Sequence, residues 1–541
     1  MSYSTKRLDH LGIVSGVFDA FKIKDIIDEV IPAQQRNVTH GEAVKAMVLN
    51  ALGFTSRALY LTEEFFKTKP VELIREGLDP SELNDDALGR TLDRLYETGV
   101  TELFAKIAGS VMSQLEERSL IAHLDSTSFS FSGRYHSQKQ QEPEAIKITR
   151  GYSKDHRPDQ VQAGLVLICD HITKIPMWME CVNGNSSDKT QLSATLKAFK
   201  EQLQGPSPLV VMDSAFYTKE GLKEHRDTKW ISRPPLTIKE VKEALQNVDQ
   251  EGWITDESGI TYQELSSEYG EVTQRWFLVH SEAKAAQEHR TLEKKIEREA
   301  EGLRKQLKKL KKQSFDCEED TRRAGLTVEA KLKYHRFITH SIQAHAHYTK
   351  PGRPKRGEEP TQVTYSFEAE FEQLPELFTE AESSQGLYLI ATNELDAELY
   401  PAERVIKTYK AQGVTVERGF RFLKDPMFFA DSLFLKKPSR LMSLMMVMTL
   451  SLLVYSAAEF LLRKRLAEAD ETVPNQVGKP TRTPTLRRVF QVFEGIEVLT
   501  ITQGESSQRL ILNLRDEHRH LLQFMEPSVV NLYLGEDGCG T

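Results

Sequence analysis

The feature that most constrains the fold of this chain is an uncharged apolar run, LMSLMMVMTLSLLVYSAA, at residues 441–458. A helix of this length can cross a bilayer, so a membrane span is one interpretation. Basic residues flank both of its ends, which gives no orientation by the positive-inside rule, and five of its eighteen residues are Ser, Thr or Tyr. A helix that is apolar on all sides can also lie inside a large soluble protein, and we favour this second interpretation.

The chain is long enough to form a large soluble protein around such a helix. Its 541 residues allow three or four domains at about 150 residues each. Lys and Arg total 71 and Asp and Glu total 79, a formal net charge of −8. The four Cys are far apart and form no CxxC pair, which disfavours a zinc knuckle or a secreted disulfide framework and suits a reducing cytoplasm. The first thirty residues show helical spacing and no export signal.

Periodicity divides the chain into five predicted domains. Residues 1–115 are predicted to be all-helical, with Thr39-x-x-Glu42 as a capping box. Residues 116–236 begin with three strands and then alternate helix and strand, which predicts an α/β fold with a mixed sheet. Residues 386–466 return to this pattern and contain the apolar run. Residues 467–541 are predicted to form a tail domain.

Residues 237–385 form a predicted insertion of different character. Residues 281–360 hold 20 Lys and Arg against 13 Asp and Glu, a charge of +7 in an acidic protein. A long charged helix is predicted there, with a narrow apolar stripe of the coiled-coil kind. This stripe can pair between subunits or fold back within one chain. Its members are Leu292, Ile296, Leu303, Leu307 and Leu310.

Three acids are candidate catalytic residues. Asp125 lies in the first predicted sheet strand, and Asp213 ends the apolar strand VVMD, at the sheet edge where open sheets hold ligands. Asp213 can equally be the N-cap of the next helix. Glu417, Arg421 and Lys424 share one face of a predicted helix, either as a solvated ion-pair stripe or, for Glu417, as part of a pocket wall.

Three carboxylates from two strands and a helix can hold two Mg²⁺ ions, which prefer oxygen ligands, and Mn²⁺ can substitute. Such a pair activates water or a 3′-hydroxyl and stabilises the leaving oxygen of a phosphodiester. Asp125, Asp213 and Glu417 are therefore candidates both for catalytic residues and for metal ligands.

Several segments resemble one enzyme family closely. HLDSTS, GYSKDHRPD, GNSSDKTQL, VVMDSAFY and YKAQGVTVERGFRFLK, in this order, are similar to insertion-sequence DDE transposases. LDHLGIVSG, NALGFTSRALYLTEEFF and LNDDALGRTLDRLY resemble the helical domain of the 1634-type group of the hairpin-forming, family 4-like transposases. The resemblance implies an RNase H-like core interrupted by an insertion, with Asp125, Asp213 and Glu417 as its acids.

The resemblance also implies a Tyr-x2-Arg-x3-Glu-x6-Lys pattern around the last acid. Lys424 matches the Lys, but Tyr409 stands one residue early and Gly413 occupies the Arg position. Lys410 or Arg421 are then alternative contacts to the terminal phosphate.

Further DNA contacts are expected from residue type and position. Trp253 and Trp276 can stack on a flipped base or simply belong to the core. Lys154, His156 and Arg157 can orient phosphate or form a plain loop. Basic side chains along the long helix can bind the DNA backbone, or they can simply form a solvated face of that helix. The basic residues around Gly-Arg-Pro can lie in a minor groove, or they can belong to a flexible linker. These are Lys305, Lys308 and Lys309 of the helix, and Arg353, Lys355 and Arg356 of the loop.

Together these features predict a DDE transposase that cuts insertion-sequence ends and transfers them into target DNA with Mg²⁺. By resemblance we expect a hairpin intermediate, a homodimer on paired terminal inverted repeats, and a cytoplasmic, nucleoid-associated protein of bacterial or archaeal type. The alternatives are an RNase H-like metal nuclease without strand transfer, a transposase-derived DNA-binding protein without catalysis, and a membrane-anchored protein.

Overall fold

The computed structural model divides into two compact units, and each is described by itself. One unit comprises Met1–Pro235, Ser266–Arg275 and Ala391–Thr541, and the other comprises Leu236–Leu265 and Trp276–Ile390. The structure describes residues 2–33, 37–54, 61–117, 119–131, 145–152, 157, 159–203, 205–246, 248, 251–257, 259–349, 359–374, 385–425, 435, 437–503 and 506–535.

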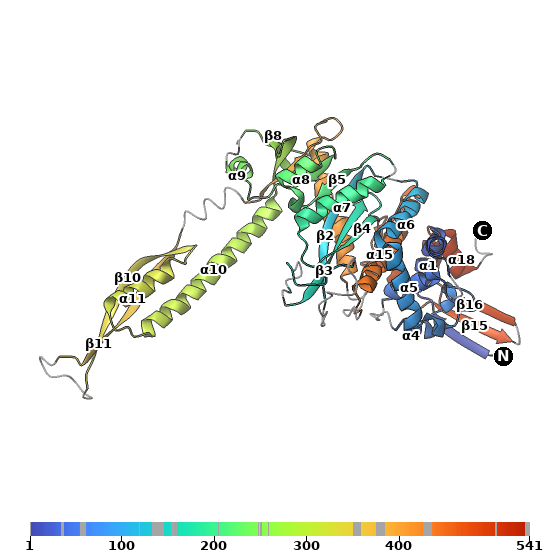
Figure 1. The fold of residues 1–541 in the computed structure, drawn as a ribbon, viewed down its shortest axis with the longest axis horizontal. Coiled ribbons are helices and arrows are strands. Elements are labelled where there is room, and N and C mark those ends of the chain that lie inside the picture. The colour runs from blue at the N-terminus through green and yellow to red at the C-terminus, as the bar shows by residue number, and fades with distance from the viewer. Residues whose placement is uncertain are drawn as a thin grey trace. The chain divides into compact units, whose positions relative to one another are not determined.

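The first unit holds most of the helices and the central strands (Figure 1). Its helices are α1 (Leu11–Ala20), α2 (Ile23–Val30), α3 (His40–Ala51), α4 (Thr62–Lys67), η2 (Val71–Leu73), η3 (Pro80–Leu83), α5 (Asp85–Thr98), α6 (Val100–Gln114), α7 (Asp188–Gln202), η4 (Ser214–Phe216), α8 (Lys219–Glu224), α13 (Ala402–Lys410), η5 (Ala411–Val414), α14 (Val416–Leu423), α15 (Pro438–Glu468), α16 (Leu486–Val492), α17 (Asp516–Leu522) and α18 (Pro527–Leu534). Its strands are β1 (Ser2–Arg7), β2 (Ile121–Phe131), β3 (Val161–Asp170), β4 (Pro176–Val182), β5 (Leu209–Met212), β6 (Trp230–Ser232), β13 (Val473–Pro474), β14 (Pro480–Thr481), β15 (Glu497–Gln503) and β16 (Ser506–Leu512).

The sheet of the first unit has the strand order β4-β3-β2-β5-β6. β2, β3 and β4 form an antiparallel meander, and β5 and β6 extend it in parallel with β2. Residues Ala391 and Thr392 of β12 (Leu387–Thr392) add to the β6 edge in antiparallel register. This is the mixed RNase H-like sheet that the sequence predicts, so the expected α/β fold class is confirmed.

Local capping signals act as predicted in the N-terminal helices. Thr39 Oγ1 accepts from the backbone N–H of Glu42, and the Glu42 carboxylate accepts from the N–H of Thr39, which completes the capping box of α3. Asn84 caps α5 by accepting from the N–H of Ala87. These side chains satisfy backbone donors that would otherwise lack a partner at the first helical turn.

The prediction that the chain begins with helix is wrong for its first residues. Ser2–Arg7 is a strand, β1, which pairs with β15 in antiparallel register from Ser2 opposite Thr502 to Arg7 opposite Glu497. The six residues SYSTKR are largely exposed and have little apolar pattern of their own. Their conformation depends on a partner strand at the other end of the chain, which no local pattern could indicate.

The apolar run forms the middle of α15, the one helix among the described residues long and apolar enough to cross a membrane. Of its most apolar window, 89% is buried inside the protein. α15 packs against α1, α3, α5 and α6 and also against β4 and α14 (Figure 1). Its hydroxyls are satisfied internally: Ser443 donates to Leu92 O, and Thr449 and Ser451 donate to carbonyls one turn back. α15 is therefore packed as a core helix.

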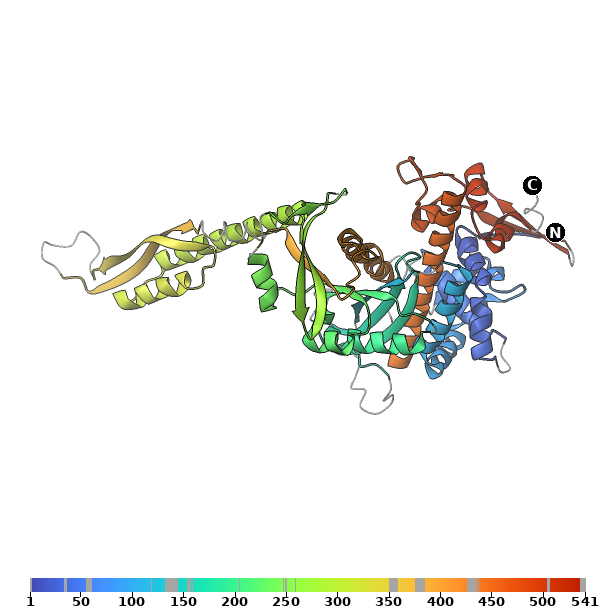
Figure 2. The same cartoon turned by 90° about the horizontal axis from the view of Figure 1, so that it is seen from above.

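The C-terminal segment packs on the N-terminal helices. α18 lies against α1, where a Cβ on Gly12 would be 2.6 Å from the Tyr533 ring, and one on Gly16 would be 2.6 Å from Val529. The Tyr533 hydroxyl donates to Asp9 O at 2.6 Å. Figure 2 shows the red C-terminal elements beside the blue N-terminal ones. Both chain ends thus belong to one unit.

The second unit is built around one long helix. Its elements are α9 (Lys239–Gln246), β7 (Ile254–Thr255), α10 (Glu282–Lys312), α11 (Glu318–Glu329), β10 (His335–His347) and β11 (Gln362–Gln373), with parts of β8 (Thr261–Tyr269), β9 (Val272–His280) and β12. α10 buries Ile296, Ala300, Leu303 and Leu310 and packs against the β10–β11 hairpin and α11. The apolar stripe therefore folds back within one chain.

We expect Leu453→Ala to destabilise the first unit by about 2–5 kcal/mol, because Leu453 is fully buried in α15 and its loss leaves a cavity. Urea unfolding followed by circular dichroism measures this. The matched control is Leu399→Ala, at a side chain that is 54% exposed, for which we expect a change within about 0.5 kcal/mol. Equal effects of the two substitutions would contradict the packing described.

His10 makes stability depend on pH. Its ring stacks on Phe490 at 4.2 Å and Nε2 contacts Leu52 O at 2.7 Å, and burial lowers its pKa from 6.5 to about 4. The unfolded chain then binds a proton more readily, so this stabilisation is complete above about pH 6.5 and is lost as pH falls toward 4. The free energy of unfolding that His10 contributes therefore changes by about 3 kcal/mol between these two pH limits. His10→Asn should flatten the dependence of unfolding free energy on pH, whereas His289→Asn, at a more exposed ring, should leave it unchanged.

Candidate active site

Asp125 and Asp213 are brought together by the register of two parallel strands. β2 and β5 pair from Ile121 opposite Leu209 to Leu124 opposite Met212. The next position of each chain is an aspartate, so the same register places Asp125 beside Asp213. Residues opposite each other in a parallel pair point to the same face, and neighbouring strands lie about 4.8 Å apart. Two carboxylates therefore stand side by side where β5 ends.

Each aspartate is oriented by the backbone that follows it. Asp125 Oδ1 accepts from the N–H of Ser126 at 2.7 Å, and Asp213 Oδ1 accepts from the N–H of Ser214 at 2.6 Å. Asp213 also caps η4, so the simple N-cap interpretation describes part of its role. Both residues are half-buried.

Glu417 lies on a helix that crosses the same face of the sheet. α14 contacts β2 and β3, burying Val416, Phe420 and Leu423, and the Lys424 ammonium lies 5.8 Å from the Phe129 ring of β2. Phe129 and Asp125 are four residues apart on β2 and therefore point to the same face. Glu417 is exposed, one residue after the start of α14.

The direction of the Glu417 side chain follows from the opposite flank of α14. On that flank Arg418 pairs with Glu459 of α15, and the Phe422 and Tyr455 rings lie 4.7 Å apart. α15 also contacts β4, the strand at the far side of the sheet from β5. The flank that carries Glu417 therefore faces the β5 side, where Asp213 lies.

The three acids share a face without closing into a compact cluster. Among the residues described, no group of three His, Cys, Asp or Glu side chains is close enough to hold a metal ion. The donor set is nonetheless suited to Mg²⁺, since all three groups are carboxylates and two of them are adjacent. Asp125 and Asp213 would hold such an ion, with Glu417 completing the site from α14.

In the segment that departs from the family pattern, the side chain of Arg421 folds back onto the backbone at Gly413. Arg421 Nη2 donates to Gly413 O at 2.9 Å, and a Cβ on Gly413 would be 3.5 Å from Glu417 Oε2. Arg421 thus reaches back to the position where the family pattern has Arg. Tyr409 is half-buried and Lys410 is exposed at the end of α13.

His123 packs beside the site. It lies two residues before Asp125 on the same face of β2, and its Nε2 is 2.8 Å from His171 Nδ1. Burial, together with the nearby His171 and Lys174, lowers the pKa of His123 to about 3, so the ring is neutral at physiological pH.

Other predicted DNA contacts fall in several environments. Trp276 is only 3% exposed, so its ring is part of a core and would have to leave it to stack on a base, whereas Trp253 is half-buried beside His280. Arg157 is exposed and pairs with Asp159 at 3.0 Å. Lys305, Lys308 and Lys309 are exposed on α10. Lys154, His156, Arg353, Lys355 and Arg356 lie outside the described residues.

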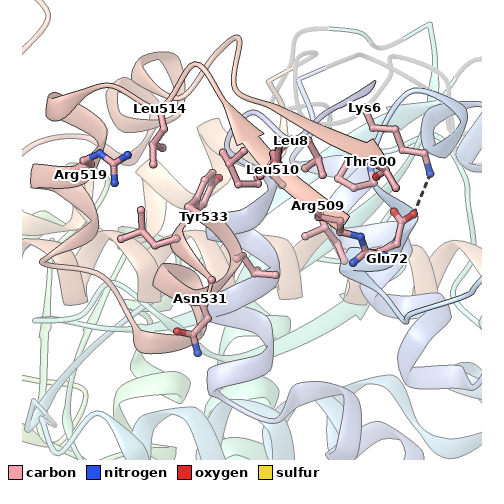
Figure 3. A pocket seen from close by; sticks show the side chains of 17 residues that line it. Lys6, Leu8, Glu72, Thr500, Arg509, Leu510, Leu514, Arg519, Asn531 and Tyr533 are labelled. Carbon is pink, nitrogen blue, oxygen red and sulfur yellow. Dashed lines mark hydrogen bonds and ion pairs between the residues drawn. The ribbon is translucent and has the colours of Figure 1, made fainter. Parts of the chain in front are cut away.

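Two further features were missed in the sequence. Glu459, the first charge after the apolar run, is buried and receives both Arg418 and Arg463. Its position at the end of that run was the available signal. The second feature is a cavity of about 450 Å³ lined by residues of β1, β15, β16 and α18 (Figure 3). None of the three acids lines it, and its Lys6 pairs with Glu72 at 3.4 Å.

A carboxylate pair at the end of a parallel strand in an RNase H-like sheet, with a third acid on a helix above it, defines a class of enzymes that cut nucleic acids. Residues 117–454 match the family model described as "Transposase DDE domain", and residues 3–109 match "Domain of unknown function (DUF4277)". The chain therefore belongs to the DDE transposase family and is an enzyme that cleaves and moves DNA.

Comparison with whole proteins adds little detail. No curated protein matches the sequence. A solved piggyBac transposase synaptic complex with hairpin DNA is similar at 11% identity, covering 91% of this chain and 83% of that chain, with a TM-score of 0.36.

The proximity of the two aspartates can be tested without activity. We expect Asp125→Cys/Asp213→Cys to form a disulfide on mild oxidation, because side-by-side residues on neighbouring strands meet the Cα separation of about 4.4–6.8 Å that a disulfide needs. Peptide mapping by mass spectrometry detects the bond. Asp125→Cys/Asp227→Cys is the matched control, since Asp227 precedes β6 and lies at the other end of the sheet. A crosslink only in the control would refute the register.

Proposed function

We propose that this transposase cleaves DNA at the ends of an insertion sequence, with Asp125, Asp213 and Glu417 as its catalytic acids, and joins the freed ends to target DNA. The observation that carries the proposal is the parallel register of β2 and β5, which puts two carboxylates side by side. The position of α14 over β2 supports Glu417 as the third acid.

When bound, two Mg²⁺ or Mn²⁺ ions would supply the charge that activates a nucleophilic oxygen and stabilises the leaving oxygen of a phosphodiester. The hydrogen bonds that Asp125 and Asp213 accept from the N–H groups of Ser126 and Ser214 would orient the two carboxylates for this role. Glu417 approaches from a helix held in place by the core. Arg421, anchored on Gly413 O, would contact a phosphate next to the bond that is cut.

Further steps are proposed from family membership. A hairpin intermediate would release the element from flanking DNA, and a homodimer would hold two terminal inverted repeats together. Exposed Lys305, Lys308 and Lys309 on α10 would add affinity for DNA backbone without reading sequence.

The test is cleavage of a labelled duplex that carries the flanking element end. We expect Mg²⁺-dependent cutting by the wild type and a fall to the EDTA background in Asp213→Asn or Glu417→Gln, because each substitution removes a charged oxygen ligand. Asp227→Asn and Glu403→Gln are matched controls, at an exposed turn and on α13, and should cut normally.

The outcomes separate the alternatives. Cutting by Asp213→Asn at the wild-type rate would overturn the metal assignment. Cutting without joined products when a target plasmid is supplied would indicate a nuclease without strand transfer. Tight binding without cutting, in either metal condition, would indicate a DNA-binding protein without catalysis.

A further inference from the structure

A second cavity of the first unit adjoins α14 and has a strongly basic lining. It measures about 320 Å³ and is walled by the β3–β4 turn, α14, α15 and the start of α16. Its cations are Lys174, Arg418, Arg421 and Arg487, and Asp425 is the acid among its lining residues. Residues from four separate parts of the chain therefore meet in one basic cavity.

The charges around this cavity do not balance. Arg418 and Arg463 share one carboxylate, Glu459, with Nη–Oε distances of 2.6 and 3.0 Å. Arg487 pairs with Asp425 at 3.1 Å. Counting these groups with Lys174, Arg421 and the Asp170 carboxylate, which acts on Lys174, gives five cations and three carboxylates, an excess of two positive charges among the described residues.

Within the part of the chain that the structure describes, two of the cations have only neutral hydrogen-bond partners. Lys174 Nζ donates to Thr415 Oγ1 at 3.1 Å and to His171 O, and Arg421 donates to Gly413 O. Burial lowers the pKa of Lys174, and Arg418 and Arg463 lower it further, against the opposite effect of Asp170. Like charges held together in a partly desolvated cavity repel each other, and a bound anion relieves that repulsion.

We propose that this cavity binds a backbone phosphate of the DNA strand being cut. The proposal rests on DNA being the substrate of the adjacent acids. Arg418 directly follows Glu417, and Arg421 lies one helical turn further, so an anion in the cavity would be adjacent to the catalytic helix. Guanidinium groups offer paired N–H donors that match phosphate oxygens. The cavity lies on the flank of α14 that faces α15, so a phosphate held there would bring the strand across the helix that carries Glu417.

The test measures DNA binding in EDTA, where no cleavage occurs. Fluorescence anisotropy with the labelled element-end duplex gives the affinity of the full-length protein over a range of salt concentrations. For Lys174→Gln/Arg487→Gln we expect a fall in affinity of about tenfold, consistent with charge-assisted hydrogen bonds. We also expect the slope of log K against log salt to fall by about 1, because one phosphate is no longer neutralised by the protein.

Three further variants separate the effect of the cavity from a general loss of positive charge or of stability. Lys67→Gln/Arg509→Gln removes the same charge at two exposed sites, each paired with its own acid, and should keep the wild-type slope. Arg421→Gln changes an exposed side chain and should weaken binding without altering the thermal midpoint. Arg487→Lys, with Lys174 unchanged, keeps the charge and should show a slope of log K against log salt close to that of the wild type.

Wild-type affinity and slope in folded Lys174→Gln/Arg487→Gln and Arg421→Gln proteins would overturn the proposal and leave the metal assignment intact. Stabilisation by inorganic phosphate, with DNA affinity unchanged in the variants, would assign the cavity to free phosphate and would also overturn it. If Asp213→Asn still cuts DNA while the cavity variants still bind DNA more weakly, the assignment of the catalytic acids is contradicted and the phosphate-binding cavity is not.

Discussion

Burial of α15 is the interaction on which the rest of the first unit depends. Its buried side chains belong to one hydrophobic core with those of the N-terminal helices, the sheet, α14 and the C-terminal helices. The uncharged run 441–458 of this helix can be accommodated in water only if it is surrounded, and at about 25 cal/mol per Å² its burial is a large stabilising contribution. The helical N-terminal region and the sheet are therefore parts of one packed body.

The same helix positions the third acid. Arg418 of α14 makes a two-point contact with Glu459 of α15, and Gly419 allows α14 to approach Leu452 closely. A buried carboxylate that is shared by two guanidiniums costs less to desolvate than an isolated one. The orientation of Glu417 thus follows from core packing on one flank of α14, while its other flank stays open to substrate.

Much of the fold could be predicted because its signals are local. Alternation in LIAHLDSTSFSFSG, the apolar strand VVMD and the Thr39–Glu42 capping box each depend on residues close together in sequence. β1 could not be predicted, because its partner β15 lies almost five hundred residues away. The basic cavity could not be predicted from the sequence either, because Lys174, Arg421 and Arg487 come from separate elements and meet only after folding.

The amino-acid sequence determines the chemistry available here: three carboxylates, a basic insertion and a helix too apolar to remain in water. Tertiary structure decides how these are combined. Asp125 and Asp213 become neighbours only through the β2–β5 register, and Glu417 joins their face only because α15 holds the opposite flank of α14. The physical reason is that hydrogen-bond register and core packing act between segments far apart in the chain, whereas side-chain chemistry is a property of each residue alone.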